Sequence, residues 1–98
     1  MADFRVLHLG INYKSDPLTQ AQRKEIEGIL DKARDWLRYT PNCWLIYTAL
    51  SPSIWHKRLK ERLPWITAQS YLIVAVDINE RSGWLAEEVW DWMREHRS

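Results

Sequence analysis

Apolar and polar residues alternate along several short segments of the chain, which predicts β-strands. Along other segments apolar residues recur every three or four positions, which predicts helices. The expected strands are Phe4–Ile11, Arg34–Tyr39, Asn42–Leu50 and Ser70–Ile78. The first has one apolar face, formed by Leu7, Leu9 and Ile11, and one mixed face. The last is apolar almost throughout, so we expect both of its faces to be covered.

Three helices are expected from the same pattern. They run from Pro17 to about Lys32 or Ala33, from Pro52 to about Leu63, and onward from about Trp84. Asp16-Pro17 and Ser51-Pro52 each combine an N-cap residue with a proline at the first helical position. Gly28 interrupts the first helix, and we expect it to mark a close approach to the sheet.

The order of these elements is β-α-β-β-α-β with an added C-terminal helix. This order is typical of the split βαβ, ferredoxin-like fold of the α+β class. We expect a four-stranded antiparallel sheet in the order four-one-three-two, with both main helices on one face. The opposite face then needs a cover, for which the candidates are the C-terminal helix, a second copy of the chain, or a nucleic acid.

Composition narrows the class of protein. The 98 residues are 46% hydrophobic and 28% charged, which predicts a single globular domain spanning 1–98. The net charge of +1 gives no general attraction to nucleic acid. Cys43 is the single cysteine and lies in an apolar strand, so we expect a buried thiol. We find no zinc or cofactor motif, no signal peptide and no membrane-length apolar run, and we expect a cytoplasmic protein.

Seven tryptophans are more than a core of this size encloses easily, because each indole brings roughly 150–250 Å² of surface to bury. We therefore expect several aromatic residues at a dimer interface. The residues expected there are Trp36, Tyr39, Trp44, Trp84 and Trp90. The alternatives are that partly exposed indoles roof the core, or that aromatic side chains on an open sheet stack on bases.

Charges are segregated along the chain. The second helix is basic, and together with one strand residue it forms the expected nucleic-acid or partner-binding set: Lys57, Arg58, Lys60, Arg62 and Arg38. The alternative is an ordinary solvated helix face. The last helix carries Glu87, Glu88, Asp91 and Glu95, so two copies, or one copy and a larger partner, are able to dock by charge complementarity.

Two isolated polar residues are assigned structural roles. His8 lies within the first strand without a second histidine or a carboxylate fixed near it, and we interpret it as a structural histidine. Asp77 follows the last strand and is expected to cap a turn. Because the last strand pairs antiparallel to the first, Asp77 is expected to lie far from Asn12, which rules against a shared metal site.

Several aromatic and aliphatic motifs spread over nearly the whole chain carry a resemblance. They are Trp36–Tyr39, Trp44-Leu45-Ile46, Thr48, Leu50-Ser51, Leu59, Leu63, Tyr71-Leu72-Ile73-Val74, Gly83-Trp84 and Trp90-Asp91-Trp92. With them the chain resembles the SinR-like small bacterial proteins, relatives of the small adaptation subunit of CRISPR systems. The resemblance implies a ferredoxin-like fold, a homodimer, and kinship to nucleases whose strand-one aspartate binds a divalent metal across the dimer axis.

The chain departs from that family at the metal position. It reads His8-Leu9-Gly10-Ile11-Asn12, and the next carboxylate along the chain is Asp16, whereas hard cations generally rely on carboxylates. We therefore expect a non-enzymatic, dimer-forming accessory protein of a bacterial nucleic-acid or phage-defence system, without catalytic residues, metal or cofactor. The alternative is a metal-dependent ribonuclease or a nucleic-acid-binding protein. A small-ligand sensor has no support in the sequence.

Overall fold

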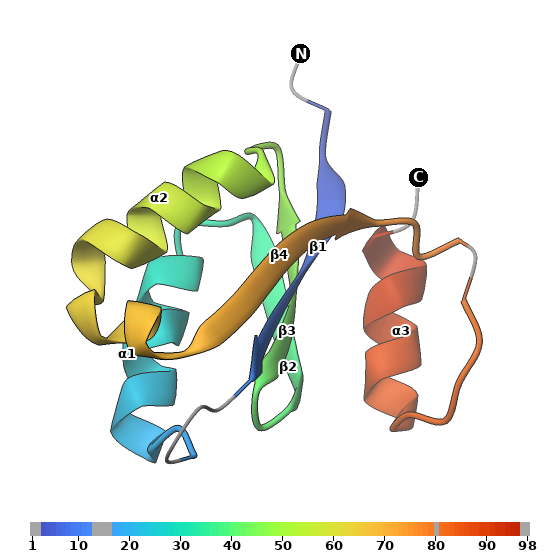
Figure 1. Ribbon diagram of the computed structural model, residues 1–98. Coiled ribbons are helices and arrows are strands. Elements are labelled where there is room, and N and C mark those ends of the chain that lie inside the picture. Colours follow the sequence, from blue (N-terminus) through green and yellow to red (C-terminus); the bar gives the residue numbers. More distant parts are fainter. Residues whose placement is uncertain (1–2, 13–16, 80, 97–98) are drawn as a thin grey trace.

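The computed structural model describes residues 3–12, 17–79 and 81–96 (Figure 1). Four strands form one sheet: β1 (Arg5–Asn12), β2 (Asp35–Thr40), β3 (Cys43–Thr48) and β4 (Ser70–Val76). The helices are α1 (Gln20–Leu30), α2 (Pro52–Arg62) and α3 (Glu87–His96), and a short 3-10 helix, η1 (Pro64–Ala68), leads into β4. Within the described residues, no helix has both the length and the apolarity that a bilayer crossing requires.

The sheet has the order β2-β3-β1-β4, and each pair of neighbouring strands is antiparallel. Read from the other edge the order is four-one-three-two, so β1 and β3 are central and β2 and β4 are the edges, as expected. Leu9 of β1 lies opposite Trp44 of β3 on one side and Ile73 of β4 on the other. The protein is thus an α+β structure built on an open antiparallel sheet.

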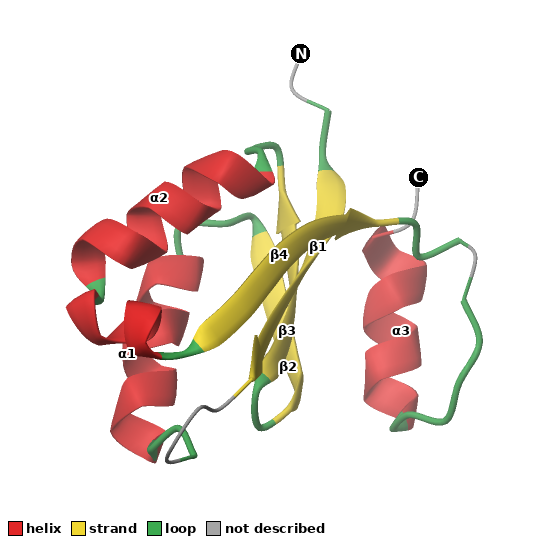
Figure 2. Cartoon of the chain, in the orientation of Figure 1, coloured by secondary structure: helices red, strands yellow, loops and turns green. Residues whose placement is uncertain are grey.

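Helices α1 and α2 cover one face of this sheet (Figure 2). The main core lies between these two helices and the sheet. It contains Leu7, Leu9, Ile11, Leu18, Ile26, Ile29, Leu30, Trp44, Ile46, Trp55, Leu59, Leu63 and Ile66. Its two enclosed indoles also find acceptors: Trp44 Nε1 donates to Glu27 Oε2 at 2.9 Å, and Trp55 Nε1 donates to Thr48 Oγ1 at 3.2 Å. Burial of these two side chains therefore leaves neither of their N–H groups without a partner.

Helix α3 lies on the opposite face of the sheet (Figures 1 and 2). It closes a second, smaller core formed by Val6, Leu45, Ile78, Val89, Trp92 and Met93. Asp35, at the start of β2, fixes the helix, because one carboxylate oxygen accepts a hydrogen bond from Trp92 Nε1 at 2.9 Å and contacts His96 Nε2 at 2.7 Å. The His96 ring also stacks on Tyr47, with 4.2 Å between ring centroids.

Helix starts follow capping chemistry. The expected start of α2 is confirmed: Ser51 caps it, Pro52 opens it, and the helix ends before Pro64. The expected start of α1 is wrong, because the helix begins at Gln20 behind an N-cap at Thr19, whose side chain forms a capping box with Gln22. Asp16, the expected cap, lies outside the described residues.

The ends of helices depart further from the expectations. Helix α1 ends at Leu30, short of the expected Lys32 or Ala33. Helix α3 begins at Glu87, so Trp84 lies before the helix in the segment that connects it to β4.

Two packing expectations are also wrong. The outer face of β4 is not covered, since Leu72 is 64% exposed and Val74 is 40% exposed. The expectation failed because an apolar run does not reveal whether enough helix is present to cover both faces. Gly28 does not mark a close approach either, because a Cβ built there meets no atom within 4 Å.

Candidate functional site

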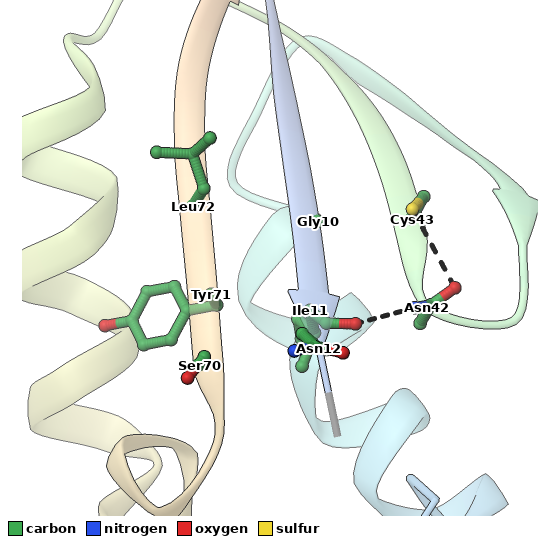
Figure 3. Close-up of a pocket in the computed structure, with 8 residues that line it drawn as sticks. All are labelled: Gly10, Ile11, Asn12, Asn42, Cys43, Ser70, Tyr71 and Leu72. Atoms are coloured by element: carbon green, nitrogen blue, oxygen red, sulfur yellow. Dashed lines mark hydrogen bonds between the residues drawn. The ribbon is translucent and has the colours of Figure 1, made fainter. Parts of the chain in front are cut away.

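A shallow hollow of about 350 Å³ lies on the sheet face that α3 leaves open (Figure 3). Its floor is Gly10 of β1, which pairs with Cys43 on β3 and with Leu72 on β4. Because Gly10 has no side chain, the surface of β1 is depressed between the side chains of the two neighbouring strands. The hollow is therefore a direct consequence of one glycine in a central strand.

Neutral polar groups line one end of this hollow. Asn42, in the β2–β3 turn, donates from Nδ2 to the backbone oxygen of Ile11 at 2.6 Å, and Figure 3 shows this bond. Thr40 Oγ1 donates to Asn42 Oδ1 at 2.9 Å, which fixes the amide. The turn thus holds the end of β1 in place, and its amide groups are already engaged.

Three reactive side chains gather next to Gly10. His8 Nε2 hydrogen-bonds the Tyr39 hydroxyl. A Cβ built on Gly10 would lie 3.1 Å from His8 Cε1 and 3.9 Å from Cys43 Sγ, so the histidine ring leans over the glycine towards the thiol. Cys43 is half-buried on this open face, which corrects the expectation of a buried thiol. A side chain at position 10 would therefore crowd the imidazole ring.

The surroundings of His8 and Tyr39 favour the neutral form of both side chains. Burial lowers the pKa of His8, which favours the neutral imidazole. Burial, and after it the neighbouring Cys43 thiol, raises the pKa of Tyr39 to about 12. Neutral side chains cost less to remove from water than charged ones. The cluster therefore suits contact with an apolar or neutral surface, and the structural role expected for His8 stays a prediction.

No carboxylate is among the described residues that line the hollow at the Asn12 end of β1. Asn12 pairs with Ser70, at the start of β4, whereas Val76 pairs with Val6, so Asp77 lies towards the other end of β1. Asp77 Oδ1 accepts a hydrogen bond from the Asn79 backbone N–H at 2.9 Å, which confirms its turn-capping role. Throughout residues 3–12, 17–79 and 81–96, no group of three or more His, Cys, Asp or Glu residues is placed to hold a metal ion.

The aromatic residues expected at a dimer interface occupy different environments. Trp44 is 0% exposed in the main core, so its side chain is not available to a partner, and that expectation is corrected. Trp36 packs against the same core and donates to Asp31 Oδ1 at 2.8 Å. Trp90 is half-buried, with the Arg81 guanidinium 5.9 Å from its ring centroid. Trp84, at 99% exposed, is the most accessible.

The expected basic residues do not form one surface. Arg38 pairs with Glu27 at 3.3 Å and lines a hollow with Arg23. Arg58 and Arg62 line a separate cleft between α1 and α2.

Sequence reasoning missed Lys32, which lines the same cleft as Arg58 and Arg62. The signal in the sequence was that Lys32 follows Gly28 by four positions, because residues four apart lie on the same face of a helix.

Comparison with known proteins adds no relative to this description. No model of a known protein family, no curated protein and no solved structure matches the chain. The open sheet face and the basic cleft are therefore interpreted from their own chemistry.

Proposed function

We propose that this chain is a self-associating interaction protein with a ferredoxin-like fold, in which two copies join through β4. The antiparallel order β4-β1-β3-β2, with α1 and α2 on one face, supports that classification. The observation that carries the proposal is an edge strand whose exposed side chains are apolar.

Strand β4 lacks the features that keep sheet edges apart. Ser70–Val76 contains no charged residue and no proline, and among the described residues no further strand pairs with its outer edge. Natural proteins usually protect such edges with charge, proline, bulges or a covering segment, because open backbone groups recruit another strand. Leu72 and Val74 add exposed apolar area next to this edge. A second copy of the chain offers the same edge and the same side chains.

Two-fold pairing of β4 would bring these side chains together. In an antiparallel pair centred on Ile73, Leu72 of one copy lies opposite Val74 of the other, and the reverse pair forms by symmetry. Cross-strand apolar pairs of this kind stabilise sheets. The resulting eight-stranded sheet would join the two open faces into one continuous surface.

The mass of the protein in solution tests this proposal. We expect light scattering coupled to size exclusion to give a dimer for the natural sequence and a monomer for the variant Leu72→Lys/Val74→Lys. The matched control is Ile54→Lys on α2, where an apolar side chain is 42% exposed and does not line the pocket between α2 and β4, and this variant should remain dimeric. A monomeric natural protein at millimolar concentration, or a dimer that survives the β4 substitutions, would contradict the proposal.

The biological setting that we propose is a bacterial nucleic-acid or phage-defence system, because the chain resembles the SinR-like relatives of the small CRISPR adaptation subunit. The alternative function is a nucleic-acid-binding protein or a metal-dependent ribonuclease. Its test is RNA cleavage with Mg²⁺ or Mn²⁺, with and without a chelator. Cleavage that is lost in Asn12→Ala would favour the ribonuclease over the interaction protein.

A further inference from the structure

A cleft of about 170 Å³ between α1 and α2 is lined by Gly28, Ile29, Lys32, Arg58 and Arg62. Three of its five lining residues carry a positive charge, and none carries a negative one. We propose that this cleft binds a phosphoryl group, the dianionic phosphate of a monoester or of free phosphate. This proposal does not depend on self-association.

The three cations of the cleft have no anionic partner in the described structure. The ion pairs formed within residues 3–12, 17–79 and 81–96 join Arg38 to Glu27, Arg94 to Asp91 and His96 to Asp35. Lys32, Arg58 and Arg62 take part in none of them. Like charges that converge on one concave site raise the local concentration of anions, so the cleft favours an anionic ligand.

One of the two arginines is held in position. The Arg58 guanidinium lies 5.2 Å from the ring centroid of Trp55, and Trp55 is itself fully buried in the main core. Stacking on a fixed ring limits the rotamers of the guanidinium and leaves its N–H groups free to donate. A planar fork of donors matches the oxygens of a phosphate, which bind arginine in bidentate fashion.

Gly28 supplies the space. Glycine is unfavourable inside a helix, and close packing does not require it here, because a Cβ at this position meets no atom within 4 Å. Any side chain at position 28 would instead start from the wall of the cleft. The glycine that α1 tolerates is thus at the place where a ligand needs room.

The volume of the cleft limits the ligand. Sites for whole drug-sized molecules enclose about 300–1,000 Å³, and this cleft is smaller, so it accommodates a phosphoryl group while the remainder of a larger ligand stays outside. The hollow beside Arg38 is the less suitable alternative, because Arg38 is paired with Glu27 and Arg23 Nη1 donates to the Leu18 backbone oxygen at 2.7 Å.

Titration followed by amide chemical shifts tests the proposal in the natural protein. The probes are inorganic phosphate, adenosine 5′-monophosphate, adenosine, and one oligonucleotide with and without a 5′-phosphate. We expect saturable shifts at residues 28–32 and 58–62 with the phosphorylated probes and none with adenosine. If inorganic phosphate alone saturates the site, free phosphate is the source. If the 5′-phosphorylated strand binds more tightly than the unphosphorylated strand, a strand end is the source.

Two double variants separate the cleft from general electrostatics. Arg58→Gln/Arg62→Gln and Lys57→Gln/Lys60→Gln each remove two charges from α2, and Lys60 lies in the last helical turn, as Arg62 does. We expect the arginine pair to weaken phosphate binding roughly ten-fold or more, which is the effect of losing about one charge-assisted hydrogen bond. The lysine pair should weaken it less than about two-fold, as expected of screened charges that do not line the cleft. Equal losses in the two variants, or no saturable shift with any phosphorylated probe, would overturn the proposal.

Circular dichroism verifies that both variants remain folded. Their solution mass should equal that of the natural protein, so failure of this proposal is distinguishable from failure of dimerisation.

Discussion

The two faces of the sheet are built differently although they share every strand. The face under α1 and α2 is sealed by fully buried aliphatic residues and two enclosed indoles. The face under α3 has a smaller apolar core and is held at one edge by Asp35, while the side of β4 stays open. The first face supplies most of the buried area, which drives folding. The second is therefore free to serve as a contact surface at little cost in stability.

The same substitution on the two faces gives the largest contrast. Leu9→Ala removes a fully buried side chain and should destabilise the protein by about 2–5 kcal/mol, because it leaves a cavity under α1. Leu72→Ala, at a side chain that is 64% exposed, should cost less than about 0.5 kcal/mol in the monomer. Urea unfolding at low protein concentration measures both. Similar losses at the two positions would show that the open face is covered in solution.

A smaller effect is expected where α3 is anchored. Asp35→Ala removes the acceptor of the Trp92, His96 and Trp36 backbone N–H contacts and should cost about 1–3 kcal/mol, because three donors lose their partner.

Hydrogen exchange should locate this loss in α3 and leave α1 protected. The matched control is Asp91→Ala, whose carboxylate forms only an exposed pair with Arg94, and its cost should stay below about 1 kcal/mol. If α3 exchanges as in the natural protein after Asp35→Ala, its apolar face alone holds it.

The smallest effect concerns Tyr39 on the open face. The pKa of Tyr39 is raised to about 12 from the usual 10.0. Between pH 10 and pH 12 the Tyr39 hydroxyl therefore keeps its proton in the folded state, whereas it has lost the proton in the unfolded state. Stability from this group is complete below pH 10 and is lost as pH rises towards 12. Phenolate absorbance should show a component that titrates near pH 12 and is absent in Tyr39→Phe. If the absorbance lost in Tyr39→Phe is instead a component that titrates near pH 10, Tyr39 is more hydrated than its position indicates.

Local patterns anticipate the parts of the fold that depend on local physics. Alternation in β1 identifies the face formed by Leu7, Leu9 and Ile11, and Ser51-Pro52 identifies the start of α2. Whether the outer face of β4 is covered was not predictable in this way, since it depends on how much of the sheet α3 packs against. Trp44 was misplaced for a related reason, because an indole in a central strand faces the core or solvent according to register alone.

The candidate sites were less predictable than the strands. The hollow at Gly10 requires knowing which residues of β3 and β4 flank it, and the cleft requires the crossing of α1 and α2. The basic run on α2 was visible, but its division into Arg58 and Arg62 on one side and Lys57 and Lys60 on the other depends on the neighbouring helix. The spacing of residues along one helix predicts which side chains share a face, but it does not predict which element packs beside that face.

The exposed indole of Trp84 is an intrinsic fluorescent probe. Six indoles are sheltered to some degree, whereas that of Trp84 is 99% exposed in the segment between β4 and α3. The fluorescence of Trp84 should be red-shifted and quenched by iodide. The fluorescence of Trp44 and Trp55 should not be red-shifted, and iodide should not quench it. Any molecule that settles over this segment would shift the red component towards the blue and protect it from the quencher, so binding there can be followed without a label.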